Sequence, residues 1–219
     1  MRHWGMHRRK ILAALLISLA SAIIGGGLAW QTNQGLSVDL LYLFGKLAGR
    51  DKTAERSPDV VVVAIDEITY LTPPFDSSPQ PLWTPYVAKV IDKLLDNGVK
   101  VVGLDVIYPA TGEAFIKGYD RSFLLALHKG AQDGRIVLGK VQHQIRAVAP
   151  AESQFIAAGR EANLRLLNVI VDPDGVVRRL PLAFQNDAGG AASALTPSMS
   201  LELAVRASGK PVVVNADGV

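Results

Sequence analysis

DVVVVAIDEITY, residues 59–70, is a valine-rich apolar run that ends in two acidic residues, Asp66 and Glu67. A second stretch, VKVVGLDVIYP at residues 99–109, repeats this arrangement and ends its run in Asp105. Short uninterrupted apolar runs are typical of strands that are covered on both faces. We therefore predict that each run forms a buried strand with a carboxylate at its end.

A helix is predicted between these two strands. Thr84 is placed to cap its amino end, Pro85 suits the first helical position, and Gly98 ends it. The order strand at 60–65, helix, strand at 99–104 is a crossover connection, which joins parallel strands. Because the carboxyl ends of parallel strands lie at one edge of a sheet, the residues that follow the strands are expected to meet there.

The alternation of strands and helices continues downstream. Two apolar runs around the turn residues Asp172-Pro173-Asp174-Gly175 predict an antiparallel hairpin. The other predicted elements are a helix at 120–129, a strand at 135–140 that ends in Lys140, helices at 152–158 and 196–208, and a strand at 211–215.

The edge formed by the strand ends is the candidate ligand-binding site, as in other open α/β sheets. Its candidate residues are Asp66, Glu67, Trp83, Asp105, Tyr108 and Lys140. An alternative assigns Asp66 and Asp105 to capping backbone amides in the loops, and Trp83 to packing in the core.

Our leading interpretation assigns no catalytic residue, metal ion or cofactor to this chain. The four histidines lack the spacing of metal ligands, and no glycine-rich phosphate loop is present. Asp172 and Asp174 are interpreted as turn residues rather than metal ligands. Arg178 and Arg179 are interpreted as part of a solvated strand face, with pairing of one of them to a carboxylate as the alternative.

The basic residues are concentrated at the amino terminus. The formal net charge is +3, but Arg2, Arg8, Arg9 and Lys10 precede the first apolar stretch, and the rest of the chain is nearly neutral. Without a dense basic cluster, nucleic-acid binding is not expected. The chain has no cysteine, which excludes disulfides and thiolate chemistry.

Residues 11–30 form a stretch of 20 residues without a charge. A helix of about 20 apolar residues can cross a hydrocarbon layer, so a transmembrane helix is predicted, with the basic residues before it in the cytoplasm. A signal peptide cleaved near Ala20-Ser21-Ala22 and an ordinary buried helix are the alternatives.

The predicted fold class is α/β, with one N-terminal transmembrane helix followed by a mixed sheet that has a parallel βαβ core and a C-terminal antiparallel hairpin. The predicted segments are a cytoplasmic basic tail at 1–10, the transmembrane helix at 11–30, a juxtamembrane helix and linker at 31–58, and an extracytoplasmic domain at 59–219. We expect the chain to be part of a longer protein, because its last residues resemble the start of another hairpin.

From about Leu36 onward the sequence resembles the second type of CHASE domain, the extracytoplasmic sensory module attached to bacterial cyclases, histidine kinases and serine/threonine kinases. The stretches that carry the resemblance are VVVVAID at 60–66, Trp83 through Ala88 to Leu95, VKVVGLDVIYP at 99–109, Asp120 with Leu124-Leu125-Ala126, Asn163, VDPDGVVRRLPL at 171–182, and SMSLELAVRA at 198–207. Leu82-Trp83-Thr84-Pro85 departs from the family's fuller Trp-Pro-Trp-Arg string, so no role of that Arg is carried over.

The resemblance implies a sensory input module without chemistry of its own. It places the main domain on the periplasmic or extracellular side of the inner membrane, and implies that a ligand or envelope signal reaches an intracellular cyclase or kinase. The implied partners are a small-molecule or envelope ligand, the membrane, and a second copy paired through the helix at 36–49.

Two other functions are kept as alternatives. The first is a Mg²⁺-dependent phosphoryl-handling enzyme that uses Asp66, Asp105 and Lys140 at the strand ends. The second is a passive dimerisation module.

Overall fold

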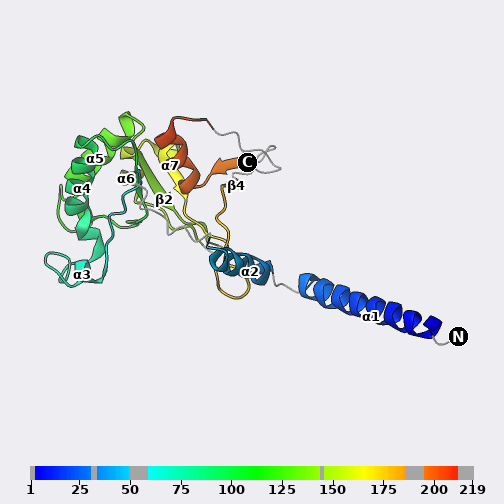
Figure 1. Ribbon diagram of the computed structural model, residues 1–219. Helices are drawn as coiled ribbons and strands as arrows, with labels where there is room; N and C mark the ends of the chain where they lie inside the picture. Colours follow the sequence, from blue (N-terminus) through cyan, green and yellow to red (C-terminus); the bar gives the residue numbers. More distant parts are fainter. Residues whose placement is uncertain (1–2, 31–33, 50–58, 144–145, 186–194, 212–219) are drawn as a thin grey trace. The chain divides into compact units, whose positions relative to one another are not determined.

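The computed structural model describes residues 3–30, 34–49, 59–143, 146–185 and 195–211 (Figure 1). The chain divides into two compact units. Unit 1 comprises Met1–Val61 and Ile170–Arg179, and unit 2 comprises Val62–Val169 and Leu180–Val219.

Unit 2 is built on a three-stranded parallel sheet with the order β1-β2-β3. The strands are β1 at Val102–Leu104, β2 at Ile136–Lys140 and β3 at Leu164–Leu166. The first four residues of β2 are buried, which explains why its sequence is apolar without alternation. The connection from β1 to β2 contains helix α5, Arg121–Gln132, so a parallel βαβ core is confirmed.

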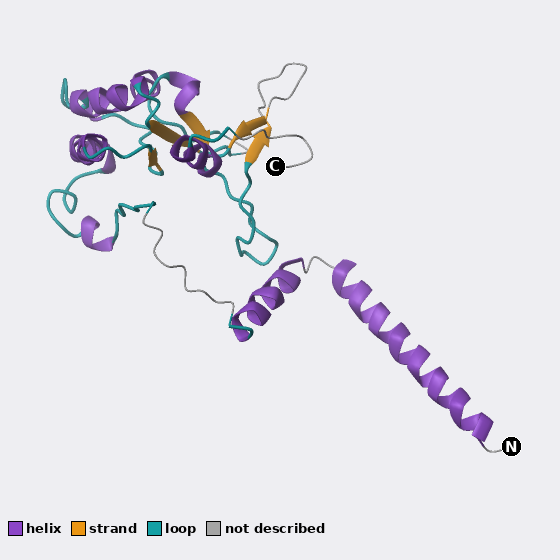
Figure 2. Cartoon of the chain, turned by 45° about the horizontal axis from the view of Figure 1, so that its top comes forward, coloured by secondary structure: helices purple, strands orange, loops and turns teal. Residues whose placement is uncertain are grey.

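Helices cover both faces of this sheet (Figure 2). On one face, alternate strand residues such as Leu104 and Ile136 share a buried core with Leu127 of α5 and Ile91 of α4, Thr84–Asp96. On the other face, a Cβ added to Gly103 would lie 2.6 Å from a methyl group of Leu203. Helix α7, Met199–Ser208, therefore packs directly on the backbone of β1.

Shorter elements complete the described part of unit 2. They are α3 at Glu67–Tyr70, the 3₁₀ turns η1 at Gln80–Trp83, η2 at Gly112–Ala114 and η3 at Arg160–Asn163, helix α6 at Glu152–Ala157, and the strands β4 at Ala183–Gln185 and β5 at Leu195–Pro197. Strands β4 and β5 pair antiparallel.

The predicted cap of α4 is wrong. The residue before the helix is Trp83, and Thr84 is already helical. The Thr84 side chain is fully buried and its hydroxyl donates to Asp120 Oδ1 at 2.5 Å. Thr84 has helical backbone angles, φ −52° and ψ −39°, so it lies inside the helix, and its hydroxyl bonds to a partner 36 residues away in the chain. The ends of α7 follow local rules, since the Ser198 hydroxyl accepts from the Leu201 amide and Gly209 adopts φ +67°.

The strand predicted at 60–65 is also absent. The structure assigns no strand to these residues, and the side chains of Val60 to Val63 are between 58% and 83% exposed. A strand exists only where a neighbouring backbone pairs with it, and β1 pairs with β2 alone within the described sheet. A valine-rich sequence therefore does not form a strand here, because no neighbouring strand pairs with it.

The hairpin predicted around Asp172 to Gly175 forms only in part. The turn is present, with the Gly175 amide donating to the Asp172 carbonyl at 2.8 Å and Gly175 at φ +83°. The flanking runs meet at a single antiparallel bridge, Ile170 with Arg179, because β3 pairs parallel to β2 instead. The strand predicted at 211–215 lies outside the described residues except for its first position.

Unit 1 contains helices α1, His3–Trp30, and α2, Gln34–Leu47, together with the turn at 170–179. Among the helices of the described residues, none is both apolar enough and long enough to pass through a bilayer, so the transmembrane helix predicted at 11–30 is not supported.

We expect the sheet and α5 to form one folding core. Leu127 has no exposed surface, so Leu127→Ala should lower the free energy of unfolding by about 2–5 kcal/mol. Leu125 lies on the same helix with 59% of its surface exposed, and Leu125→Ala should change stability by less than about 0.5 kcal/mol. Urea unfolding of both variants checks this, and equal losses would contradict the assignment of the core face.

Candidate functional site

The strand register brings Asp105 and Lys140 to one edge of the sheet. Leu104 pairs with Leu138, so the residue after β1 and the last residue of β2 both lie at the carboxyl ends of neighbouring strands. We call this the strand-end edge. Asp105 is exposed, and Lys140 Nζ lies 3.4 Å from Glu161 Oε2. That separation and the 70% exposure of the Glu161 side chain make the ion pair weak.

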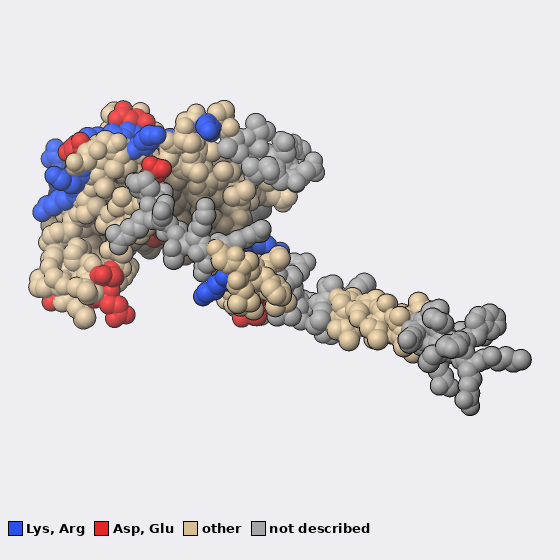
Figure 3. Space-filling model, viewed as in Figure 1, with Lys and Arg blue, Asp and Glu red and all other residues tan. Residues whose placement is uncertain are grey.

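Asp66 and Glu67 do not follow a strand. Asp66 caps α3, where its Oδ1 accepts hydrogen bonds from the Thr69 amide at 2.9 Å and the Thr69 hydroxyl at 2.8 Å. These two bonds lower the pKa of Asp66. Glu67 is the first residue of α3 and is exposed, and acidic side chains gather over this helix (Figure 3). Asp66 therefore caps backbone amides in the loop, as the alternative interpretation predicted.

Trp83 and Tyr108 lie in the core, each only 2% exposed. Trp83 Nε1 donates to the Ser78 carbonyl at 3.0 Å, and its ring packs edge-on against Tyr70 and Phe75. The Tyr108 ring packs edge-on against Phe123, and burial raises the pKa of Tyr108 to about 12. Both side chains therefore pack in the core. A role of any of the six candidate residues in ligand binding stays a prediction.

Arg178 is the centre of the densest ion-pair group in the described part of unit 1. Its side chain is 9% exposed, and Nε and Nη2 donate to the two carboxylate oxygens of Asp39 at 2.8 and 2.7 Å. Nη1 donates to Asp172 at 3.1 Å and to Asp174 at 2.9 Å. Arg179 Nη2 donates to the second oxygen of Asp172 at 2.6 Å. These five residues are called the Arg178 cluster below.

The cluster joins two segments that are far apart in the sequence. Asp39 belongs to α2, whereas the other four residues belong to the turn that follows β3. Hydrogen bonds from Arg178 lower the pKa of Asp39 and lower that of Asp174 to about 2, and the same bonds raise the pKa of Arg178. The interpretation as a solvated face is therefore wrong for Arg178, whose side chain is only 9% exposed. The side chain of Arg179 is 56% exposed and also pairs with Asp172.

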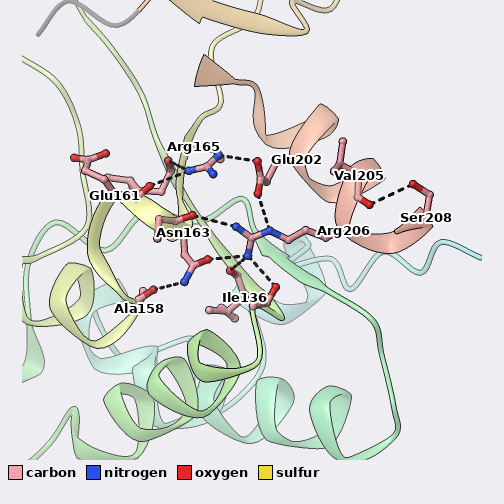
Figure 4. A network of polar contacts seen from close by, with 12 residues as sticks. Ile136, Ala158, Glu161, Asn163, Arg165, Glu202, Val205, Arg206 and Ser208 are labelled. Atoms are coloured by element: carbon pink, nitrogen blue, oxygen red, sulfur yellow. Dashed lines mark hydrogen bonds and ion pairs between the residues drawn. The ribbon is translucent and has the colours of Figure 1, made fainter. Parts of the chain in front are cut away.

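A second network, in unit 2, holds α7 to the sheet (Figure 4). Arg206 Nη1 donates to the Asn163 side chain at 2.7 Å and to the Ile136 carbonyl at 3.1 Å, and Arg206 Nε donates to Glu202 at 2.7 Å. Arg165 donates to the other oxygen of Glu202 at 2.9 Å. Burial opposes ionisation of Glu202, but these two arginines lower its pKa overall.

Sequence reasoning did not single out Arg165, Glu202 or Arg206. The signal available was the spacing of Glu202 and Arg206, which places them one helical turn apart on α7. Nothing in that spacing indicates that Arg206 also reaches β2 and η3. The network ties elements together and leaves no carboxylate of the group without a cation, so it suits a structural role better than a chemical one.

Comparison with known proteins agrees with the resemblance carried by the sequence motifs. A model of the CHASE2 domain matches residues 12–216. No curated protein and no solved structure matches the chain. CHASE2 domains are extracytoplasmic sensory domains of signalling receptors rather than catalytic domains. Because the match spans most of its length, the chain belongs to the CHASE2 domain family.

Proposed function

We propose that this chain is the extracytoplasmic sensory input of a bacterial signalling receptor, which passes a ligand or envelope signal to an intracellular cyclase or kinase. Membership in the CHASE2 family supports the sensory role. The observation that carries the proposal furthest is the Arg178 cluster, because it links helix α2 to the turn that follows β3. The candidate residues at the strand-end edge, Asp105 and Lys140, are retained as proposed ligand contacts.

The Arg178 cluster has the properties expected of a coupling element. One guanidinium is shared among three carboxylates, and only Asp39 lies on α2. A signal that moves the turn therefore changes how Arg178 divides its hydrogen bonds between the turn and α2. A ligand shifts such an equilibrium only if it binds one arrangement better than the other.

The proposal predicts that the link to α2 controls output. In the full-length receptor, Asp39→Ala removes both bonds from Arg178 to α2, and we expect the cyclase or kinase output without added ligand to change by at least about fivefold. Asp174→Ala is the matched control, because it removes a carboxylate from the same guanidinium but retains the pairing with Asp39. Equal output from the Asp39 variant and the unmodified receptor would rule out coupling through α2.

The cluster should also be lost at low pH. Because the folded-state pKa values of Asp39, Asp172 and Asp174 are lowered from 3.8, their stabilising contribution is present above about pH 4 and disappears as the pH falls toward about 2. The stability difference between the unmodified chain and Arg178→Gln should therefore shrink over this interval in urea unfolding experiments. A difference that does not depend on pH between 5 and 2 would contradict the ionised state of the cluster.

We further propose that the receptor is a homodimer that pairs through α2. Leu40, Leu43, Phe44 and Leu47 lie at helical spacing along one side of α2 and are 42% to 73% exposed. An exposed apolar stripe of this kind is typical of a surface that pairs with another helix.

This pairing is testable with charge substitutions on two sides of the same helix. Leu43→Asp combined with Phe44→Asp should convert the dimer to a monomer in analytical ultracentrifugation, because it buries two carboxylates in the seam. Tyr42→Asp, on the opposite side of α2 with 78% exposure, should leave the dimer intact. An unmodified chain that sediments as a monomer would exclude the proposed pairing.

A further inference from the structure

An open cavity of about 370 Å³ lies at the amino end of α5 in unit 2. The connection from β1 to α5 contributes Glu113, Gly118 and Asp120, α5 contributes Arg121 and two leucines, and Ser153 of α6 completes the lining. This volume is at the small end of the range for ligand pockets and suits a metabolite of a few heavy atoms.

The topology places this cavity on the carboxyl side of the sheet. Helix α5 ends at Gln132, only a few residues before β2 begins at Ile136, so its last turn lies near the amino ends of the strands. Its 12 residues rise about 18 Å and bring Arg121 to the opposite side, where β1 and β2 end. The cavity is therefore formed by the connections that follow β1 and β2, the usual location of ligands in open α/β sheets.

The loop that forms one wall is held in place by its own hydrogen bonds. Buried Asp120 accepts from the Thr84 hydroxyl at 2.5 Å and from the Glu113 amide at 3.3 Å. Glu113 Oε1 in turn accepts from the Gly118 amide at 2.7 Å. These bonds fix the position of the Glu113 carboxylate and leave its second oxygen available.

The cavity presents both signs of charge beside an apolar surface. Within the described residues, Arg121 and Ser153 have no side-chain hydrogen bond or ion pair, so the guanidinium is available to an incoming carboxylate. Leu124 and Leu125 line the same cavity, and Leu125 is 59% exposed. A ligand that satisfies all of these groups carries an ammonium, a carboxylate and an apolar body.

Resting on the sensory role proposed above, we infer that this cavity binds a free α-amino acid with an apolar side chain. Its ammonium pairs with Glu113, its carboxylate pairs with Arg121, and its side chain packs on Leu124 and Leu125. L-Leucine is the probe of this class, because it combines both charges with a branched apolar group.

Isothermal titration calorimetry of the 219-residue chain tests the ligand class. We expect L-leucine to bind with a Kd below about 1 mM. 4-Methylpentanoate lacks the ammonium and 3-methylbutylamine lacks the carboxylate, and each should bind at least about tenfold more weakly. No heat and no shift in Tm with L-leucine at roughly ten times that concentration would overturn the inference.

Substitutions then test the site. Arg121→Ala and Glu113→Gln should each weaken binding of L-leucine at least about tenfold, and the Gln side chain keeps an oxygen for the Gly118 amide. Lys117→Ala removes an exposed cation from the same loop outside the cavity lining and should leave the Kd unchanged. Unchanged affinity in both cavity variants, with melting curves like that of the unmodified chain, would place the ligand elsewhere.

The full-length receptor separates this inference from the proposed function. Binding of L-leucine through Arg121 without any change in cyclase or kinase output would support the cavity and count against the sensory role. An output that responds to envelope stimuli in a chain that does not bind L-leucine would retain the sensory role and exclude the amino-acid ligand.

Discussion

The parallel pairing of β1, β2 and β3 is the constraint on which the rest of unit 2 depends. Pairing Val102 with Ile136 and Leu138 with Leu164 aligns the carboxyl ends of all three strands. Each connection must then cross back along a face of the sheet, which places α5 in the core and brings the loops after β1 and β2 together. The cavity at the amino end of α5 is a consequence of this geometry, since its lining comes from the connection after β1, from α5 itself and from Ser153 of α6.

One arginine in each unit secures a helix, and the two arginines differ in the groups to which they donate hydrogen bonds. Arg206 bonds to backbone carbonyls, to Asn163 and to Glu202, so it fixes α7 against β2 and η3 with little freedom to rearrange. Arg178 instead distributes its donors among three carboxylates, two of which are more than half exposed. Exposed carboxylates can exchange protein partners for water at small energetic expense. The first arrangement therefore suits a rigid scaffold and the second a contact that changes with a signal.

The amino-acid ligand and the coupling role of Arg178 would form one mechanism. The ligand would contact loops after β1 and β2, and the turn with Arg178 follows β3 of the same sheet. Coupling between the cavity and the Arg178 cluster requires a segment that has two conformations, with the populations of both influenced by each site. In our proposal this segment is the chain between β3 and β4, which connects the sheet to the Arg178 cluster.

Local patterns in the sequence determined α4 to α7 to within a few residues, the strands β1 and β2 with α5 between them, and the turn at Gly175. These features follow from periodicity, glycine conformation and the handedness of crossover connections, which act over a few residues or over one βαβ unit. Only the tertiary structure decided which strands pair and which side chains form hydrogen bonds with each other. Val60 to Val63 lacked a neighbouring strand, Thr84 bonded to Asp120 instead of its own helix, and Arg178 and Arg206 found carboxylates and carbonyls far along the chain. Within the part of the chain that the structure describes, no helix meets the length and apolarity needed to cross a bilayer, so the transmembrane helix predicted at 11–30 is not supported. A hydrogen bond between residues distant in sequence depends on how the whole chain packs. No local pattern around either residue predicts such a bond.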